Sequence, residues 1–149
     1  MVFRCLLALF VVLPLVSAAA PACSVTVAAK GVKGNAGVVG FVLYSSESGW
    51  PHQVEKSFKH DAVNARSGIV ELKLSGIVPG NYGIVVLHDE NENKKLDKKA
   101  SGRPKEGWGM SRDPKASLKT PKFEAAAIDL KCGDRVEVQM RYPGKEDSK

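Results

Sequence analysis

The most regular pattern in the chain is an alternation of apolar and polar side chains near its C-terminal end. Apolar residues occupy every second position from Val136 to Tyr142, with polar residues between them. Successive side chains of a strand point to opposite faces, so this spacing predicts a strand with one face in a core and one in water. The same alternation recurs at residues 70–74 and 24–27. We therefore expect three strands with one solvated face each.

Two further runs, residues 38–44 and 82–87, are apolar at nearly every position. Such runs are typical of central strands that are covered on both faces. Residues 123–130 form a sixth candidate strand, interrupted by three consecutive alanines. Turn residues separate these segments, as in Gly34-Asn35 and Pro79-Gly80-Asn81. The pattern predicts an all-β fold, an antiparallel β-sandwich of about six to seven strands, and disfavours a Rossmann or barrel enzyme.

Two long intervals, residues 45–67 and 89–121, lack a strand pattern. Loops beyond about 12–15 residues usually have a function or are disordered. Each interval holds one tryptophan, Trp50 in the first and Trp108 in the second. A loop tryptophan either covers one end of a sandwich or stacks on a sugar or aromatic partner. Both are therefore candidate ligand contacts.

Composition agrees with one globular domain, since 44% of the 149 residues are apolar. The net charge of +6 comes from charges that alternate in sign along the chain instead of forming a basic block. An electrostatic footprint for nucleic acid is a clustered basic patch. We therefore expect no nucleic-acid partner.

The N-terminal segment has the order of a signal peptide. Arg4 precedes an apolar run at residues 6–16, and the small residues 17–20 follow it. The run is shorter than the roughly 20 residues that span a bilayer, which disfavours the alternative of a membrane anchor. We expect a cleaved signal peptide at 1–19, a single β-sandwich domain at 20–144 without a transmembrane segment, and a flexible tail at 145–149. The mature protein is then periplasmic or secreted.

Cleavage removes Cys5 and leaves two cysteines, Cys23 and Cys132. An even pair in an oxidising compartment predicts a disulfide, and two free structural thiols are the alternative.

The second long interval begins with oxygen-bearing side chains at alternating positions. Asp89, Asn91, Asn93, the Lys95 carbonyl and Asp97 match positions 1, 3, 5, 7 and 9 of an EF-hand-like calcium loop. A tightly wound loop of this kind turns alternate residues inward, and Ca²⁺ needs six to eight oxygen ligands. The spacing indicates calcium as a cofactor. A polar loop in which Asp and Asn cap backbone amides without metal is the alternative.

Three features depart from that pattern. Lys94 stands where a glycine is usual, Ala100 stands where a bidentate glutamate is usual, and no flanking helices are predicted. A complete site would need a carboxylate from elsewhere, and Glu106, Glu90 and Glu92 are candidates. Several lysines nearby are expected to weaken cation binding.

A family resemblance is carried by three stretches of the sequence. They are Pro79-Gly80-Asn81-Tyr82, His88-Asp89-Glu90-Asn91-Glu92-Asn93 and Gly102-Arg103-Pro104-Lys105-Glu106-Gly107-Trp108-Gly109-Met110-Ser111. The mature chain resembles a family of secreted bacterial proteins known as domain of unknown function 2141. The resemblance implies an exported sandwich of transthyretin or prealbumin-like type with no established activity. It also places Glu106 in the same motif as the loop oxygens, and a glycine where this chain has Lys94.

No hydrolase elbow, phosphate loop or zinc-protease motif occurs, and the three histidines are dispersed in sequence. His88 is expected to be a strand-end residue whose ring orients the loop. A copper site of histidine and methionine is an alternative that the sequence does not cluster. We expect a non-enzymatic binding module for an unknown envelope or extracellular ligand. The alternative is an enzyme or a carbohydrate-binding accessory domain that uses Trp50 and Trp108.

Overall fold

The computed structural model describes residues 23–114 and 120–143. The expected signal peptide at 1–19 and tail at 145–149 lie outside the described residues. The strands are β1 Cys23–Val32, β2 Val38–Tyr44, β3 Lys59–Asn64, β4 Gly68–Ile77, β5 Gly80–Asp89, β6 Gly107–Met110, β7 Ile128–Leu130 and β8 Arg135–Gln139. Two short helical turns, η1 Val54–Lys56 and α1 Phe123–Ala126, complete the described elements.

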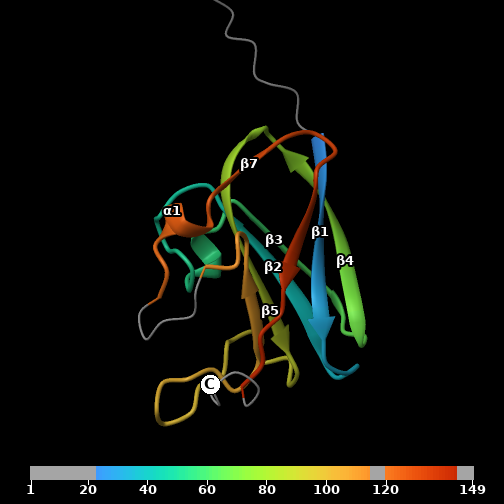
Figure 1. Ribbon diagram of the computed structural model, residues 1–149, viewed down its shortest axis with the longest axis vertical. Coiled ribbons are helices and arrows are strands. Elements are labelled where there is room, and N and C mark those ends of the chain that lie inside the picture. Colours follow the sequence, from blue (N-terminus) through green and yellow to red (C-terminus); the bar gives the residue numbers. More distant parts are fainter. Residues whose placement is uncertain (1–22, 115–119, 144–149) are drawn as a thin grey trace, which may run out of the picture.

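The strands form two sheets that face each other (Figure 1). One sheet has the order β4-β1-β8, and the other has the order β3-β2-β5-β6 with β7 paired to β5. The residues between the sheets come from both, and include Val27 of β1, Leu74 of β4, Phe41 of β2, Ile84 of β5 and Val138 of β8. The predicted β-sandwich is confirmed, with β2 and β5 as central strands.

The direction of β8 corrects the expectation of a purely antiparallel fold. β8 runs parallel to β1, with Thr26 opposite Arg135, whereas the other strand pairs are antiparallel. A disulfide joins Cys23, the first residue of β1, to Cys132, just before β8, at the ends where these strands begin. Both strands therefore start at the same end of the sandwich.

Two strands, β3 and β6, lie inside the intervals expected to be loops, so the described strands number eight and not six to seven. β3 is an edge strand with charged side chains, so it lacks an apolar alternation. β6 has the sequence Gly-Trp-Gly-Met, and glycine is depleted in strands. The candidate strand at 123–130 is also corrected. Its alanines favour a helical turn, α1, and only Ile128–Leu130 is extended.

The two sheets are joined on one side by the chain that follows β8. The Met140 N–H still donates to the Lys30 carbonyl of the three-stranded sheet, at 2.9 Å. One residue later, Arg141 pairs with Trp108 of β6, through N···O distances of 2.7 and 3.0 Å. The C-terminal segment thus passes from one sheet to the other.

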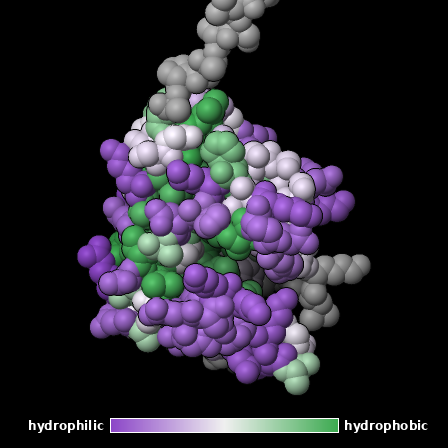
Figure 2. All heavy atoms as spheres, turned by 180° about the vertical axis from the view of Figure 1, so that it is seen from behind, coloured by the Kyte–Doolittle hydropathy of each residue, from purple (hydrophilic) through white to green (hydrophobic). Residues whose placement is uncertain are grey.

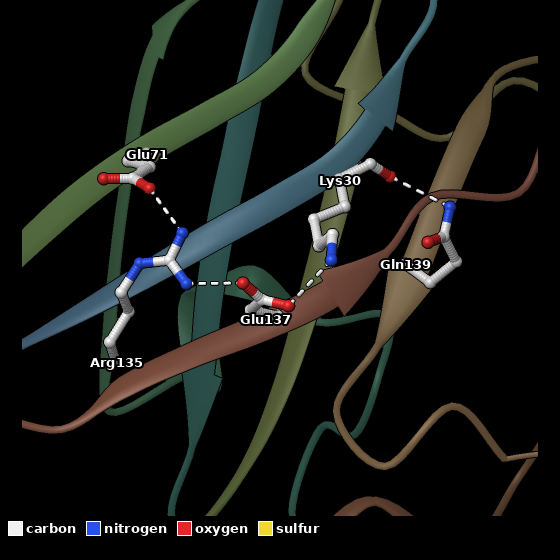
Figure 3. Close-up of polar contacts among 5 residues, drawn as sticks. All are labelled: Lys30, Glu71, Arg135, Glu137 and Gln139. Carbon is white, nitrogen blue, oxygen red and sulfur yellow. Dashed lines mark hydrogen bonds and ion pairs between the residues drawn. The ribbon is translucent and has the colours of Figure 1, made fainter.

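The outer face of the three-stranded sheet is polar and carries ion pairs across its strands (Figure 3). Arg135 contacts Glu71 of β4 at 2.6 Å and Glu137 of its own strand at 2.5 Å, and Lys30 of β1 contacts Glu137 at 2.9 Å. Hydrogen bonds from Arg135 and then Lys30 hold the pKa of Glu137 below its usual value. Exposed pairs of this kind contribute little stability each. This face is therefore a solvated one.

The predicted disulfide between Cys23 and Cys132 is confirmed, with a Cα–Cα distance of 5.4 Å. The two residues are 109 positions apart, and closing so long a loop stabilises a protein by about 4–5 kcal/mol in chain-entropy models. Within the two described ranges, no helix is long and apolar enough to cross a membrane.

Candidate functional site

The outer face of the five-stranded sheet is apolar, in contrast to that of the other sheet. The pairing register places Val42 beside Val85, Val85 beside Met110, and Leu87 beside Trp108 on this face. These side chains belong to a second apolar cluster, separate from the core between the sheets. The runs at 38–44 and 82–87 are apolar at nearly every position because one face of each strand packs in the core between the sheets and the other belongs to this second cluster.

Part of this outer face is closed by Trp50. Its ring packs edge-on against Tyr44 and Phe123, with centroids 5.4 and 5.7 Å away, and its Nε1–H donates to the Pro121 carbonyl at 2.9 Å. A Cβ on Gly83 would lie 2.6 Å from the indole, so this glycine makes room for Trp50. Trp50 therefore covers the sheet. The expectation that Trp108 lies in a loop is wrong, because Trp108 belongs to β6.

The rest of this face holds two adjoining hollows. Figure 2, which views the molecule from behind, shows hydrophobic residues gathered across the middle of the face between hydrophilic borders. The hollows have volumes of about 230 and 680 Å³, and we name them the lysine pocket and the sheet groove. The lining residues that they share are Val54, Leu87, Lys94 and Lys95.

The lysine pocket combines an apolar floor with a cationic border. Its lining consists of Pro51, His52, Val54, Val85, Leu87, Lys94, Lys95, Leu96, Lys98, Trp108 and Met110. No carboxylate is among these residues, and the three lysines form no ion pair with any carboxylate in the described part of the chain. Burial, and then the charge of Lys98, hold the pKa of His52 below its usual value. The pocket is thus a positively charged environment.

The sheet groove has a different charge balance. Its lining consists of Val38, Gly40, Val42, Val54, His60, Asp61, Ala62, Leu87, Asp89, Glu92, Lys94 and Lys95. Three acidic residues stand on its border, and the two lysines are those that it shares with the lysine pocket. A Cβ on Gly40 would meet no atom within 4 Å, so the space above this glycine is open.

The loop that borders both hollows begins at Asp89, the last residue of β5. The Asp89 side chain is buried and accepts hydrogen bonds from the N–H groups of Asn93, at 3.1 Å, and Lys94, at 2.6 Å. Lys94 has a φ of 60°, in the left-handed region. This residue stands where EF-hand-like loops have a glycine, and it adopts the conformation for which glycine is suited.

The other predicted loop ligands also come together. Asn91 Oδ1 accepts from the Asn93 N–H at 3.2 Å, and Asn93 Oδ1 accepts from the Lys95 N–H at 2.9 Å. Their side-chain amides both donate to the Asp97 carboxylate, at 2.9 and 3.1 Å. Among the residues that the structure describes, no group of three His, Cys, Asp or Glu side chains is placed to hold a metal ion. Calcium binding stays a prediction.

Glu106 closes the loop at its other end. It is 6% exposed, and its two carboxylate oxygens accept from the backbone N–H groups of Glu90, at 3.2 Å, and Asp97, at 2.9 Å. Buried carboxylates are costly unless hydrogen bonds satisfy them. Glu106 thus ties the start and the middle of the loop, at Glu90 and Asp97, to its C-terminal end.

His88 lies in β5 with its side chain buried. Its Nδ1 is 2.7 Å from the Tyr142 hydroxyl, and its Nε2 is 2.9 Å from the Ala36 carbonyl. The ring therefore connects β5 to the C-terminal segment and to the turn between β1 and β2. A Cβ on Gly107 would lie 2.4 Å from the Tyr142 ring, so this glycine is needed where the C-terminal segment crosses β6.

Sequence reasoning missed the pocket floor formed by Val85, Leu87 and Met110, and it missed Lys98 as part of a site. A signal for the floor was present, because residues 82–87 are apolar on both faces and so require a cover on each. Nothing in the sequence places Lys98 near His52.

A family model described as "Uncharacterized protein conserved in bacteria (DUF2141)" matches residues 27–139. The chain belongs to this family. In this DUF2141 protein the match extends from within β1 to the end of β8, so it includes the loop and both hollows. No curated protein and no solved structure matches the chain significantly. The transthyretin-like type of the sandwich stays a prediction.

The conformation of Lys94 leads to a prediction about stability. A left-handed conformation costs a residue with a side chain about 1–2 kcal/mol, part of which glycine loses again through its greater freedom when unfolded. We expect Lys94→Gly to raise the free energy of unfolding by about 0.5–1 kcal/mol, measured by urea denaturation. Lys95→Gly is the matched control, since Lys95 has no positive φ. Equal destabilisation by both substitutions would contradict the prediction.

Proposed function

We propose that this protein is an exported, non-enzymatic binding module whose ligand lies on the outer face of the five-stranded sheet. The observation that carries the proposal is the sheet groove, a hollow of about 680 Å³ over an apolar floor. Sites for small molecules are typically concave, mostly apolar, and about 300–1,000 Å³ in volume. The alternative, a domain that is purely structural, offers no reason to leave this part of the face uncovered.

Export is supported by two features. The order of residues 1–20 is that of a signal peptide, and the Cys23–Cys132 disulfide is of a kind that persists in oxidising compartments. A periplasmic or extracellular ligand follows from this proposal.

A non-enzymatic role is supported by the hydrogen bonds of the candidate catalytic groups. The Ser57 hydroxyl lies 3.1 Å from His60 Nδ1, but it donates to the Val54 carbonyl at 2.6 Å. A serine nucleophile instead donates its proton to the histidine base. Both ring nitrogens of His88 already have partners inside the protein.

Calcium in the 89–106 loop is a second proposal, favoured by the left-handed Lys94 and by the approach of the Asn91 and Asn93 side chains to the Asp97 carboxylate. The Asp89 carboxylate, in contrast, caps two backbone N–H groups, as the metal-free alternative predicts. For calcium to bind, the amide groups of Asn91 and Asn93 would release Asp97 and present oxygen. The ligands would be Asp89, Asn91, Asn93, the Lys95 carbonyl and Asp97, with Glu106 behind them. The dissociation constant would be roughly 10⁻⁴–10⁻³ M, as in extracellular calcium modules.

The groove itself is tested with an uncharged fluorescent probe, N-phenyl-naphthylamine. We expect its emission to rise when it binds the oxidised mature protein, and Gly40→Phe to weaken binding about tenfold because the new ring fills the groove. Ser75→Phe is the control, because it adds the same ring at an exposed position of β4, in the other sheet. Unchanged binding to Gly40→Phe, or no binding to the unaltered protein, would refute the proposal.

The calcium proposal is tested by calorimetry. We expect Ca²⁺ titration to give a heat signal that fits a dissociation constant of roughly 10⁻⁴–10⁻³ M. Mg²⁺ should bind poorly because it demands a tighter octahedral geometry. Asp97→Asn keeps an oxygen acceptor but removes the charge, so it should abolish the signal, whereas Asp129→Asn on β7 should not. An equal signal from both variants, or none from the unaltered protein, is the contrary result.

A further inference from the structure

We infer that the ligand of the outer face is a small amphipathic anion, with its apolar tail in the sheet groove and its anionic head in the lysine pocket. This inference rests on the proposed binding function and names the chemical class of its ligand.

The two hollows are continuous, because Val54, Leu87, Lys94 and Lys95 line both. One elongated molecule therefore fits across them. Of the shared residues, Leu87 belongs to β5 and Val54 belongs to η1. Apolar side chains from both elements therefore border the passage between the hollows.

The charges that border the two hollows orient such a molecule. The lysine pocket has Lys94, Lys95 and Lys98 on its border and no carboxylate in its lining. The groove shares Lys94 and Lys95 with the pocket, but it lacks Lys98 and adds the acidic residues Asp61, Asp89 and Glu92. A negative head is thus attracted to the pocket end and repelled from the groove end.

The lysines are available for a ligand. All three are exposed, and none of them forms an ion pair in the described part of the chain. This distinguishes them from Lys30 on the opposite face, whose ammonium group is held by Glu137. The position of the pocket lysines is also defined, since the backbone N–H of Lys94 binds Asp89 and that of Lys95 binds Asn93.

An amphipathic anion also fits the pocket better than a simple anion does. The floor beneath the lysines is formed by Val85, Met110 and Trp108, which offer no hydrogen bond to an oxyanion except the indole N–H. A hydrated ion would gain little from such a floor, whereas the alkyl carbons next to the head of an amphipathic anion are stabilised there by leaving water.

The test uses three matched probes on the oxidised mature protein: decanoate, decanol and acetate. Calorimetry and displacement of N-phenyl-naphthylamine report their binding. We expect decanoate to bind about tenfold more tightly than decanol, acetate to bind undetectably, and added salt to weaken decanoate binding alone.

Substitutions then locate the head. We expect the double variant Lys95→Gln with Lys98→Gln to weaken decanoate binding about fivefold while decanol binding stays unchanged. Lys99→Gln is the control, because Lys99 is in the same loop but lines neither hollow. Equal effects of the double variant and the control would overturn the assignment of the head to the pocket.

The outcomes separate this inference from the proposed function. If decanol competes with the fluorescent probe as well as decanoate does, the groove binds ligands and the anionic class is wrong. If the probe itself does not bind in the groove, the proposed function fails as well. If the protein sediments with phosphatidylglycerol vesicles but does not bind decanoate, the inference is overturned in favour of binding to a membrane surface.

Discussion

Two buried carboxylates at neighbouring strand ends hold the part of the structure that the proposed function uses. Asp89 ends β5 and Glu106 immediately precedes β6, and together they accept four backbone N–H groups of the loop between them. A carboxylate out of water is tolerated only when such bonds satisfy it. The loop is thereby kept over the outer face, where Lys94, Lys95 and Lys98 border the lysine pocket.

The family motif has a structural meaning in these terms. Its histidine joins β5 to the C-terminal segment, and its two acids hold the loop. A Cβ on Gly109 would lie 2.5 Å from the Gln139 carbonyl oxygen, so this glycine permits the close approach of the last segment to β6. Ser111 accepts from the Ile84 N–H and donates to the Ala126 carbonyl. These residues therefore hold the border of the site in place, whereas Trp108 and Met110 of the same string line the lysine pocket.

Much of the fold is predictable from local pattern. Alternation at 136–142 and 70–74 identified β8 and β4, but β8 ends at Gln139 and the alternation of residues 140–142 belongs to the crossing to the other sheet. The apolar runs identified β2 and β5 as central. The even cysteine pair predicted the disulfide. β3 and β6 escaped prediction because an edge strand needs no apolar alternation, and because the glycines of β6 serve close chain crossing instead of strand propensity. The parallel pairing of β8 depends on where distant strand ends meet, which no local period records.

The site was only partly predictable for the same reason. The spacing of Asp89, Asn91, Asn93 and Asp97 indicated a polar loop whose side chains meet, and they do. The hollow beside that loop arises from the register that sets Leu87 beside Trp108 and from the fold of residues 45–58 over the sheet. Those are contacts between segments far apart in sequence.

The location of the ligand is the claim on which this interpretation depends, and a nitrogen-15 NMR titration with decanoate tests it most directly. We expect shifts confined to the outer face of the five-stranded sheet and its border, with the amides of Leu87, Lys95 and Trp108 among those that change most. Changes centred on Lys30 and Glu137 of the opposite face, or no localised change at saturation, would contradict it.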